Sequence, residues 1–150
     1  MTRHQRRALA LAVSQKGMRE HPRGSNDNKY SRYFGFGRQF WCADFVSWAF
    51  DKTGNADNKA PWGYPSAVES ITRWGQQRGK IHSNPRAGDI FTRTDGLHTG
   101  IVLSVDGSMF TTIEGNTTET GETDEKKAFY VASHTRDASS GLYHFVRFRG

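Results

Sequence analysis

The sequence predicts an α+β fold in which helices come first and an antiparallel sheet follows. Apolar residues recur at helical spacing before Pro85, and short runs rich in β-branched and aromatic residues follow it. The 150 residues suffice for a sizeable core, so we expect a single domain over residues 1–150.

The most regular helical pattern begins at Cys42, the only cysteine of the chain. Counted from this residue, the apolar positions i+3, i+4, i+7 and i+8 are Phe45, Val46, Ala49 and Phe50. This spacing places one apolar face on the core, and Gly54 is a favourable residue to end the helix. Two further helices are predicted over residues 5–18 and 66–78, with a short helical turn over 28–33.

The helix over residues 66–78 carries a start signal of its own. Ser66 is a favourable N-cap, and Glu69 follows three residues later, as in a capping box.

The second half of the chain has the character of a sheet. Five strands are predicted, over residues 90–93, 97–105, 109–114, 128–132 and 142–148. The polar and acidic segment 115–127 is expected to be an exposed loop. The prediction is therefore a helical half packed on an antiparallel meander.

The net charge of +6 is concentrated near the N-terminus. Residues 1–40 hold nine Lys and Arg against two acidic residues, whereas the remainder holds twelve against thirteen. A basic face suits an anionic partner such as a nucleic acid, an anionic lipid or an anionic cell-wall polymer, but it also serves simply to keep a protein soluble. Charge alone does not choose among these.

No stretch of the sequence is long and apolar enough to span a membrane. The run from Ala8 to Val13 follows several arginines, but it is too short for a signal peptide and lacks a clear cleavage site, so we expect none. A single cysteine excludes an internal disulfide, so the fold does not depend on an oxidising compartment.

Cys42 is a candidate nucleophile because it opens a helix. The N-terminus of a helix carries a partial positive charge, which favours the thiolate, the nucleophilic form of cysteine. A lone cysteine in a helix is more commonly a small buried hydrophobe, so the residues downstream must decide.

His98 is the best-placed partner among six histidines, because it starts a predicted strand. Strand alternation puts His98 and Gly100 on one face, and Gly100 leaves room for the cysteine helix to approach there. A three-residue loop over 106–108, or a bulge, places Glu114 opposite Gly100 and Asn116 opposite His98, both within reach of the ring. A two-residue turn without a bulge turns Glu114 to the other face.

Four segments of the chain carry a resemblance to a known family. In order they are WCADFVSWAF, AGDIF, HTGIV and IEGN. Together they resemble CHAP domains, the cysteine, histidine-dependent amidohydrolases and peptidases, which are papain-like peptidoglycan hydrolases common in phage endolysins. ALAVSQKGMRE and NDNKYSRYFG also look like the lead-in of such domains, so the resemblance covers nearly the whole chain. It implies a papain-like fold with N-terminal helices on a five- to six-stranded antiparallel sheet.

The resemblance also implies roles for particular residues. Cys42 is then the nucleophile, His98 the base, Glu114 the residue that orients the histidine, and Asn116 an additional polar member. The implied reaction is hydrolysis of an amide bond in the peptide part of peptidoglycan, as an N-acetylmuramoyl-L-alanine amidase or an endopeptidase, without a cofactor. We expect a monomer that acts on the bacterial wall after release or export, as a phage lysin or a secreted effector.

The chain departs from the family's pattern just before the cysteine. Many papain-like enzymes place a glutamine there as an oxyanion donor, whereas here Phe40 and Trp41 separate Gln39 from Cys42. Gln39 is therefore a candidate second donor beside the backbone N–H of Cys42. Some relatives bind calcium through acids in this segment, but Tyr33 to Trp41 contain none, so no metal site is expected.

Aromatic residues around the cysteine are candidates for a groove that binds glycan or peptide stems. They are Tyr33, Phe36, Trp41, Trp62 and Tyr64. The competing explanation is packing in the core and loops, which accounts for many aromatic residues in any fold.

Two other classes of function stay open. A basic nucleic-acid-binding module is compatible with the charge, but no predicted strand interleaves basic and aromatic residues, and no specific nucleic acid is expected. A catalytically inactive wall-binding relative keeps the fold and loses the reactive cysteine. A zinc hydrolase is not indicated, because the sequence has no HExxH motif and its histidines are scattered.

Overall fold

The structure, a computed structural model, describes residues 1–55, 60–118 and 129–148 of the chain. Four α-helices lie within these ranges: α1 (Arg3–Ser14), α2 (Lys29–Tyr33), α3 (Cys42–Thr53) and α4 (Val68–Gln77). All four lie where the sequence predicts helix. None of the described helices is long and apolar enough to cross a membrane.

A mixed set of long and short strands forms one sheet. The strands are β1 (Ile81–His82), β2 (Ile90–Arg93), β3 (Thr99–Asp106), β4 (Met109–Thr117), β5 (Tyr130–Ala132), β6 (Thr135–Asp137) and β7 (Tyr143–Val146). Their order is β1-β7-β2-β3-β4-β5, with β6 also on β4, and all pairings are antiparallel. The α+β prediction is confirmed. Within the described ranges the sheet has seven strands, more than predicted, because β1 and β6 are too short to show an alternating pattern in the sequence.

The segment 115–127, predicted to be an exposed loop, is only partly described. Its first residues extend β4 to Thr117, and Gly115 is buried there. Residues 119–128 lie outside the described part of the chain.

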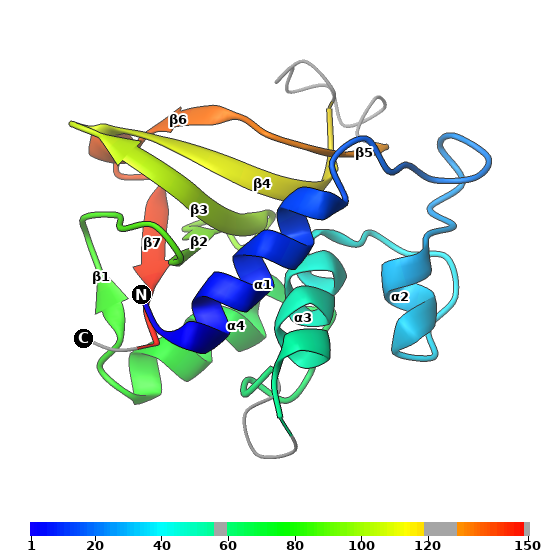
Figure 1. Cartoon of the computed structure of the whole chain (residues 1–150), viewed down its shortest axis with the longest axis horizontal. Helices are drawn as coiled ribbons and strands as arrows, with labels where there is room; N and C mark the ends of the chain where they lie inside the picture. The colour runs from blue at the N-terminus through cyan, green and yellow to red at the C-terminus, as the bar shows by residue number, and fades with distance from the viewer. Residues whose placement is uncertain (56–59, 119–128, 149–150) are drawn as a thin grey trace.

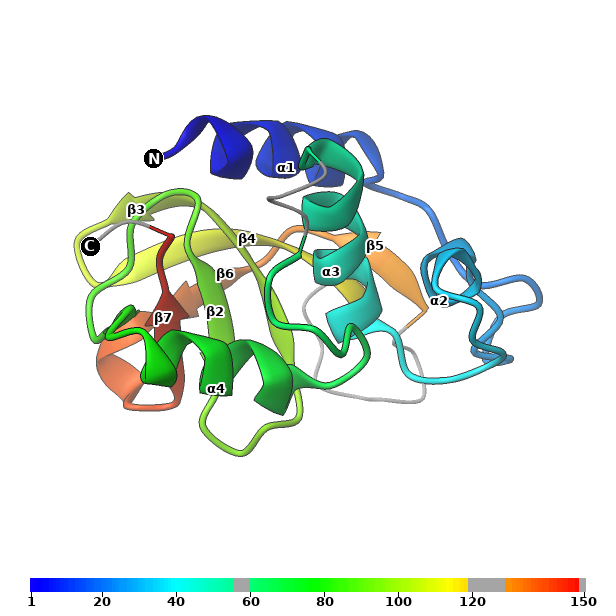
Figure 2. The ribbon, with the colours of Figure 1, turned by 90° about the horizontal axis from the view of Figure 1, so that it is seen from below.

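Helix α3 lies at the centre of the molecule. It packs between α1 and the strands β3 and β4, while α2 packs on it at one end and α4 covers β1, β2 and β7 (Figure 1, Figure 2). The predicted apolar face is fully buried at Phe45, Val46, Ala49 and Phe50. Burial of each large side chain contributes about 1.5–3 kcal/mol, so this face fixes the helix against the sheet.

The β3–β4 hairpin sets the position of Glu114. Its turn has two residues, with Asp106 opposite Met109, and a bulge at Leu103 then shifts the register by one residue. Beyond the bulge the register puts Glu114 opposite Gly100, as the sequence predicts. The sequence predicted that either a three-residue loop or a bulge sets this register, and the structure has the bulge.

Helix α3 approaches the sheet closely at Gly115 rather than at Gly100, so that prediction was wrong. A Cβ atom on Gly115 would lie 2.5 Å from Cβ of Phe45 and 2.9 Å from Cζ3 of Trp41. A Cβ atom on Gly100 would lie 2.7 Å from Cγ of Glu114. Gly115 therefore admits the helix, and Gly100 admits the carboxylate side chain.

Helix α4 starts two residues later than predicted. Its N-cap is Ala67, and no side chain caps it, so the predicted capping box of Ser66 and Glu69 was wrong. The Ser66 hydroxyl instead donates a hydrogen bond of 2.5 Å to Oδ1 of Asp44 in α3. The Ser66 hydroxyl therefore bonds to the buried Asp44 carboxylate of α3, and not to the backbone N–H groups at the start of α4.

Candidate active site

Cys42 is the first residue of α3 and is buried, with 8% of its surface exposed. Its side chain packs with those of Ala43 and Val68, the latter at the start of α4. No side chain caps α3, so the N–H groups of its first turn are not taken up by a capping residue. The sulfur therefore sits beside backbone donors at the positive end of the central helix.

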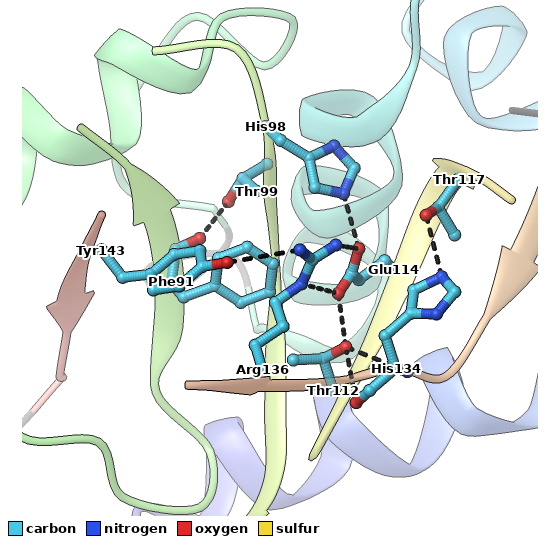
Figure 3. A network of polar contacts seen from close by, with 9 residues as sticks. All are labelled: Phe91, His98, Thr99, Thr112, Glu114, Thr117, His134, Arg136 and Tyr143. Carbon is cyan, nitrogen blue, oxygen red and sulfur yellow. Dashed lines mark hydrogen bonds and ion pairs between the residues drawn. The ribbon is translucent and has the colours of Figure 1, made fainter. Parts of the chain in front are cut away.

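His98 directly precedes β3 and faces both the cysteine and a carboxylate. Its Nε2 atom lies 2.6 Å from Oε1 of Glu114 (Figure 3). The Cys42 side chain also contributes to the raised pKa of His98, so the two side chains lie near each other. Because Nε2 is engaged by Glu114, Nδ1 is the atom left to face the sulfur. The structure thus brings three of the predicted residues together, in the order cysteine, histidine and glutamate.

Glu114 is fully buried and saturated with donors (Figure 3). Arg136 of β6 donates from Nε to Oε2 at 2.7 Å and from Nη2 to Oε1 at 2.6 Å. The hydroxyl of Thr112 donates to Oε2 at 2.5 Å, and Arg136 also reaches the Tyr143 hydroxyl at 3.3 Å. A carboxylate with this many fixed donors holds the His98 ring in one orientation.

The charges of this network support one another. Burial alone lowers the pKa of His98, but the Glu114 carboxylate and the hydrogen bonds to Cys42 and Glu114 raise it to about 9. Burial alone raises the pKa of Glu114, but His98 and Arg136 lower it well below its usual range. Glu114 is therefore ionised at neutral pH, and His98 is held as the imidazolium.

A second buried histidine belongs to the same network. His134 lies 2.9 Å from the hydroxyl of Thr117 through Nε2, and its backbone exchanges hydrogen bonds with Thr112. Burial lowers the pKa of His134, and the positive charges of Arg136 and His98 lower it further against the opposing effect of Glu114. His134 is thus favoured in the neutral form and acts as a structural neighbour of the site.

Asn116 is placed at a break in the strand pairing. Its φ is +51°, in the left-handed region, and the register between β4 and β5 shifts between Glu114 and Thr117. Asparagine tolerates this conformation better than most residues. Among the described residues, no side-chain hydrogen bond joins Asn116 to His98. Asn116 instead lies with Gly115 in the irregular stretch between Glu114 and Thr117.

Gln39 has a different environment from the one predicted. Its side-chain amide donates to Oδ2 of Asp44 at 2.7 Å and to the Ser66 hydroxyl at 2.9 Å. Both N–H bonds of that amide are therefore engaged, and neither is directed at an oxyanion. In this structure Gln39 ties the segment before Cys42 to α3.

The five aromatic groove candidates divide into two groups. Trp41 and Trp62 belong to the core, where Trp41 donates to Glu20 at 2.8 Å and Trp62 to Ser47 at 2.8 Å. Their assignment to a substrate groove was wrong, because indoles this deeply buried have no surface left to offer. The other three stay accessible: Tyr33 and Tyr64 are exposed and Phe36 is half-buried against Tyr64.

Two exposed apolar residues flank the site and were missed by the sequence analysis. Phe40 is 73% exposed and Leu97 is 67% exposed. Phe40 lies two residues before Cys42, and Leu97 directly precedes His98, so chain connectivity keeps the backbone of both residues next to these two candidates. Arg136 was missed as well, because it lies on a three-residue strand far along the chain.

No metal centre accompanies these groups in the described ranges. There, no cluster of three or more His, Cys, Asp and Glu side chains has an arrangement that could hold a metal ion.

Comparisons with known proteins bear on the fold and on the family of this chain. The crystal structure of Ly7917 superposes with a TM-score of 0.51 at 15% identity, over 95% of this chain and 61% of that one. The crystal structure of Ly7917 with the hydrolyzing product of MDP gives a TM-score of 0.51 at 19% identity, over 95% and 62%. This chain thus spans less than two thirds of the length of both, and the likeness at this identity concerns the fold. No curated protein matches the sequence. The CHAP domain profile matches residues 32–116, more than half of the chain, and the protein therefore belongs to the CHAP domain family.

Proposed function

We propose that this domain is a cysteine peptidoglycan hydrolase that cleaves an amide bond in the peptide part of the bacterial cell wall. The observation that carries the proposal is the hydrogen bond of 2.6 Å between His98 and the buried Glu114, beside Cys42 at the start of α3. Membership of the CHAP family supports it, and so does a fold shared with Ly7917, whose structure holds the hydrolyzing product of MDP.

The first half of the proposed reaction forms an acyl-enzyme. The Cys42 thiolate attacks the amide carbonyl carbon, a C–S bond forms, and the carbonyl oxygen becomes an oxyanion. The imidazolium of His98 then gives its proton to the amide nitrogen as the C–N bond breaks and the amine leaves. A raised pKa suits this step, because His98 carries the proton before the substrate arrives.

The second half releases the product. Neutral His98 takes a proton from water as the water oxygen attacks the thioester carbon. The C–S bond breaks, the acid product leaves, and the thiolate and imidazolium are restored. Glu114 does not take the proton; it keeps Nε2 engaged so that Nδ1 faces the sulfur throughout.

Oxyanion stabilisation in this proposal comes from the backbone. The N–H of Cys42 lies at the uncapped start of α3, where the helix dipole favours negative charge. Asn116 is retained as an additional polar group at the site, since it follows Glu114 on β4.

Substrate binding is assigned to the exposed apolar and aromatic side chains around the pair. These are Tyr33, Phe36, Phe40, Tyr64 and Leu97. Exposed apolar surface beside a reactive pair favours stacking on sugar rings or contact with the short side chains of a stem peptide.

The finer assignment follows the family resemblance. We propose an N-acetylmuramoyl-L-alanine amidase or an endopeptidase, monomeric and lytic, acting on the wall after release or export, in a phage or a secreted setting. The chemistry above is the same for these bonds.

The test is mass spectrometry of purified peptidoglycan digested by the wild type and by Cys42→Ala. The proposal predicts new fragments from the wild type alone, and their new amine and acid termini name the bond. Fragments of equal yield from Cys42→Ala would refute the mechanism. Absence of fragments from walls of several chemotypes, with a Cys42 that resists alkylation, would indicate an inactive wall-binding relative.

A further inference from the structure

Asp44 is a fully buried carboxylate that the proposed reaction does not use. It is the third residue of α3, two residues after Cys42. Oδ2 accepts from the Ser31 hydroxyl at 2.7 Å and from the Gln39 amide at 2.7 Å, and Oδ1 accepts from the Ser66 hydroxyl at 2.5 Å. None of the ion pairs among the described residues includes Asp44. Asp44 is therefore a buried carboxyl group held by three neutral donors and by no cation among the described residues.

The donors come from three separate segments that meet at the start of α3. Ser31 lies in α2, where it also accepts from the Asn28 side chain at 3.0 Å. Gln39 lies in the segment that leads into Cys42, and Ser66 lies in the segment that leads into α4. The Gln39 amide also donates to Ser66 at 2.9 Å, so two of the donors are linked to each other.

The bond between Gln39 and Asp44 encloses the nucleophile. Gln39 stands three residues before Cys42 and Asp44 two residues after it, so a side-chain bridge closes a short loop of chain around the cysteine. No side chain caps α3, so this bridge fixes the entry of the chain into the helix together with the hydrogen bond from Trp41 to Glu20. Ser66 fixes the neighbouring segment, two residues before Val68, which packs on Cys42.

We propose that Asp44 is a positioning residue that holds Cys42 in its reactive geometry against His98 by clamping Ser31, Gln39 and Ser66. The catalytic role of Asp44 in this inference rests on the proposed function. The inference also predicts that Asp44 is energetically coupled to the Cys42–His98 pair, and this coupling can be measured without peptidoglycan.

The geometry predicts how two substitutions of Asp44 differ. In Asp44→Asn the amide oxygen can take the place of Oδ2 and accept from Ser31 and Gln39, while the amide nitrogen donates to the Ser66 hydroxyl oxygen. The clamp then persists without its charge. In Asp44→Ala the buried Ser31 and the partly buried Gln39 and Ser66 lose their acceptor, and the loop around Cys42 is released.

The experiment is a double-mutant cycle read by the alkylation rate of Cys42 with iodoacetamide at pH 7. The measured quantity is the factor by which His98→Ala slows alkylation in each background, at a temperature where circular dichroism shows the variants folded. Since a 1 Å misplacement can cost about a hundredfold in rate, we expect a His98 factor of about tenfold or more in the wild type and in Asp44→Asn. In Asp44→Ala the factor falls to about one, whether or not the released thiol is more accessible.

Asp89 provides the matched control. It is also fully buried, but it is paired with Arg147 through bonds of 2.9 and 2.8 Å at the start of β2, away from α3. Asp89→Ala is expected to destabilise the fold and leave the His98 factor unchanged. If Asp44→Ala fails to fold, the double variant Gln39→Ala, Ser66→Ala replaces it and is expected to lower the factor several-fold. A His98 factor that stays at its wild-type value in whichever clamp variant folds, or that falls equally in Asp89→Ala, overturns the proposal.

The two proposals fail separately. Wild-type protein that leaves peptidoglycan intact, with the coupling present, refutes the hydrolase and keeps the clamp. Active hydrolase without the coupling refutes the clamp alone.

Discussion

Arg136 grips Glu114 by two parallel hydrogen bonds, and the same carboxylate holds the ring of His98. Oε1 of Glu114 is shared between the two cations, at 2.6 Å from each. Arg136 of β6 therefore orients the Glu114 carboxylate, and this carboxylate in turn orients the His98 ring. A short strand far along the chain thus supports His98, the proposed catalytic base.

Arg136→Leu is expected to weaken both the fold and the turnover. It leaves Glu114 buried beside His98 alone, and breaking a buried ion pair costs about 3 kcal/mol in the free energy of unfolding. Turnover falls about tenfold or more because the His98 ring loses its fixed support. Urea unfolding and fragment release measure the two effects. Arg93→Leu is the control, since its pair with Asp95 is exposed and is worth under about 1 kcal/mol.

Arg136→Lys keeps the charge and loses the two-pronged geometry. It should recover part of the stability and less of the turnover. Turnover and stability equal to the wild type in both Arg136 variants would show that Glu114 needs no second cation.

The pH dependence follows from the raised pKa of His98, about 9. Activity that needs the imidazolium declines as the pH rises through about 9. The same proton contributes stability that is fully present below about 6.5, the ordinary value for histidine, and that is lost as the pH rises through about 9. The pH profile of kcat/KM, with circular dichroism at each pH, measures this limb.

Glu114→Gln should move that alkaline limb to lower pH, because the carboxylate is what raises the pKa of His98 against burial. If the alkaline decline of kcat/KM stays at the same pH in Glu114→Gln, that decline belongs to a group other than His98. For Glu114 itself the sign is opposite: its lowered pKa gives stability above its unfolded value, and this stability is lost only in strong acid.

The two buried glycines of the hairpin should fail in different ways. Gly115→Ala pushes Phe45 and Trp41 away from β4 and is expected to cost about 2 kcal/mol in the free energy of unfolding. Gly100→Ala should also destabilise the fold, and it displaces the Glu114 side chain, so turnover falls even in the protein that stays folded. Gly37→Ala is the matched control, because a Cβ there meets nothing within 4 Å. Comparable stability in all three variants would contradict the packing described for β3 and β4.

Phe40→Ala and Leu97→Ala test substrate contact. Both side chains are exposed, so their loss should leave stability within about 0.5 kcal/mol of the wild type. KM for peptidoglycan fragments should rise several-fold, while the alkylation rate of Cys42 stays unchanged. Leu142→Ala, also exposed but on the segment before β7, should change neither quantity. A KM unaffected by both substitutions would remove these residues from the binding surface.

Local patterns in the sequence were enough to predict the central helix and the register of the histidine strand. The spacing of Phe45, Val46, Ala49 and Phe50 is a local property, and burial follows directly from it. The placement of Glu114 could also be predicted from the sequence. A side chain on a strand points to one of two faces, and only an odd-length loop or a bulge puts Glu114 on the face of His98. Both predictions concern residues close together in the chain.

Contacts between distant segments account for what the sequence did not show. Trp41 and Trp62 were expected at a groove, yet Trp41 is buried against Tyr30 and Glu20, and Trp62 is buried against Trp74 of α4. Ser66 was expected to cap its own helix and instead serves Asp44. Arg136 gives no local signal, since an arginine on a short strand usually faces solvent. In each case the deciding partner lies far away in the chain, where pattern and propensity carry no information.

The most direct test of the account is the alkylation rate of Cys42 near neutral pH in the wild type and in His98→Ala. If Cys42 and His98 act as one reactive pair, as proposed, His98→Ala should slow alkylation about tenfold or more. His144→Ala, on β7, should leave the rate unchanged. Equal rates in the wild type and His98→Ala would contradict the pairing and, with it, the proposed hydrolysis.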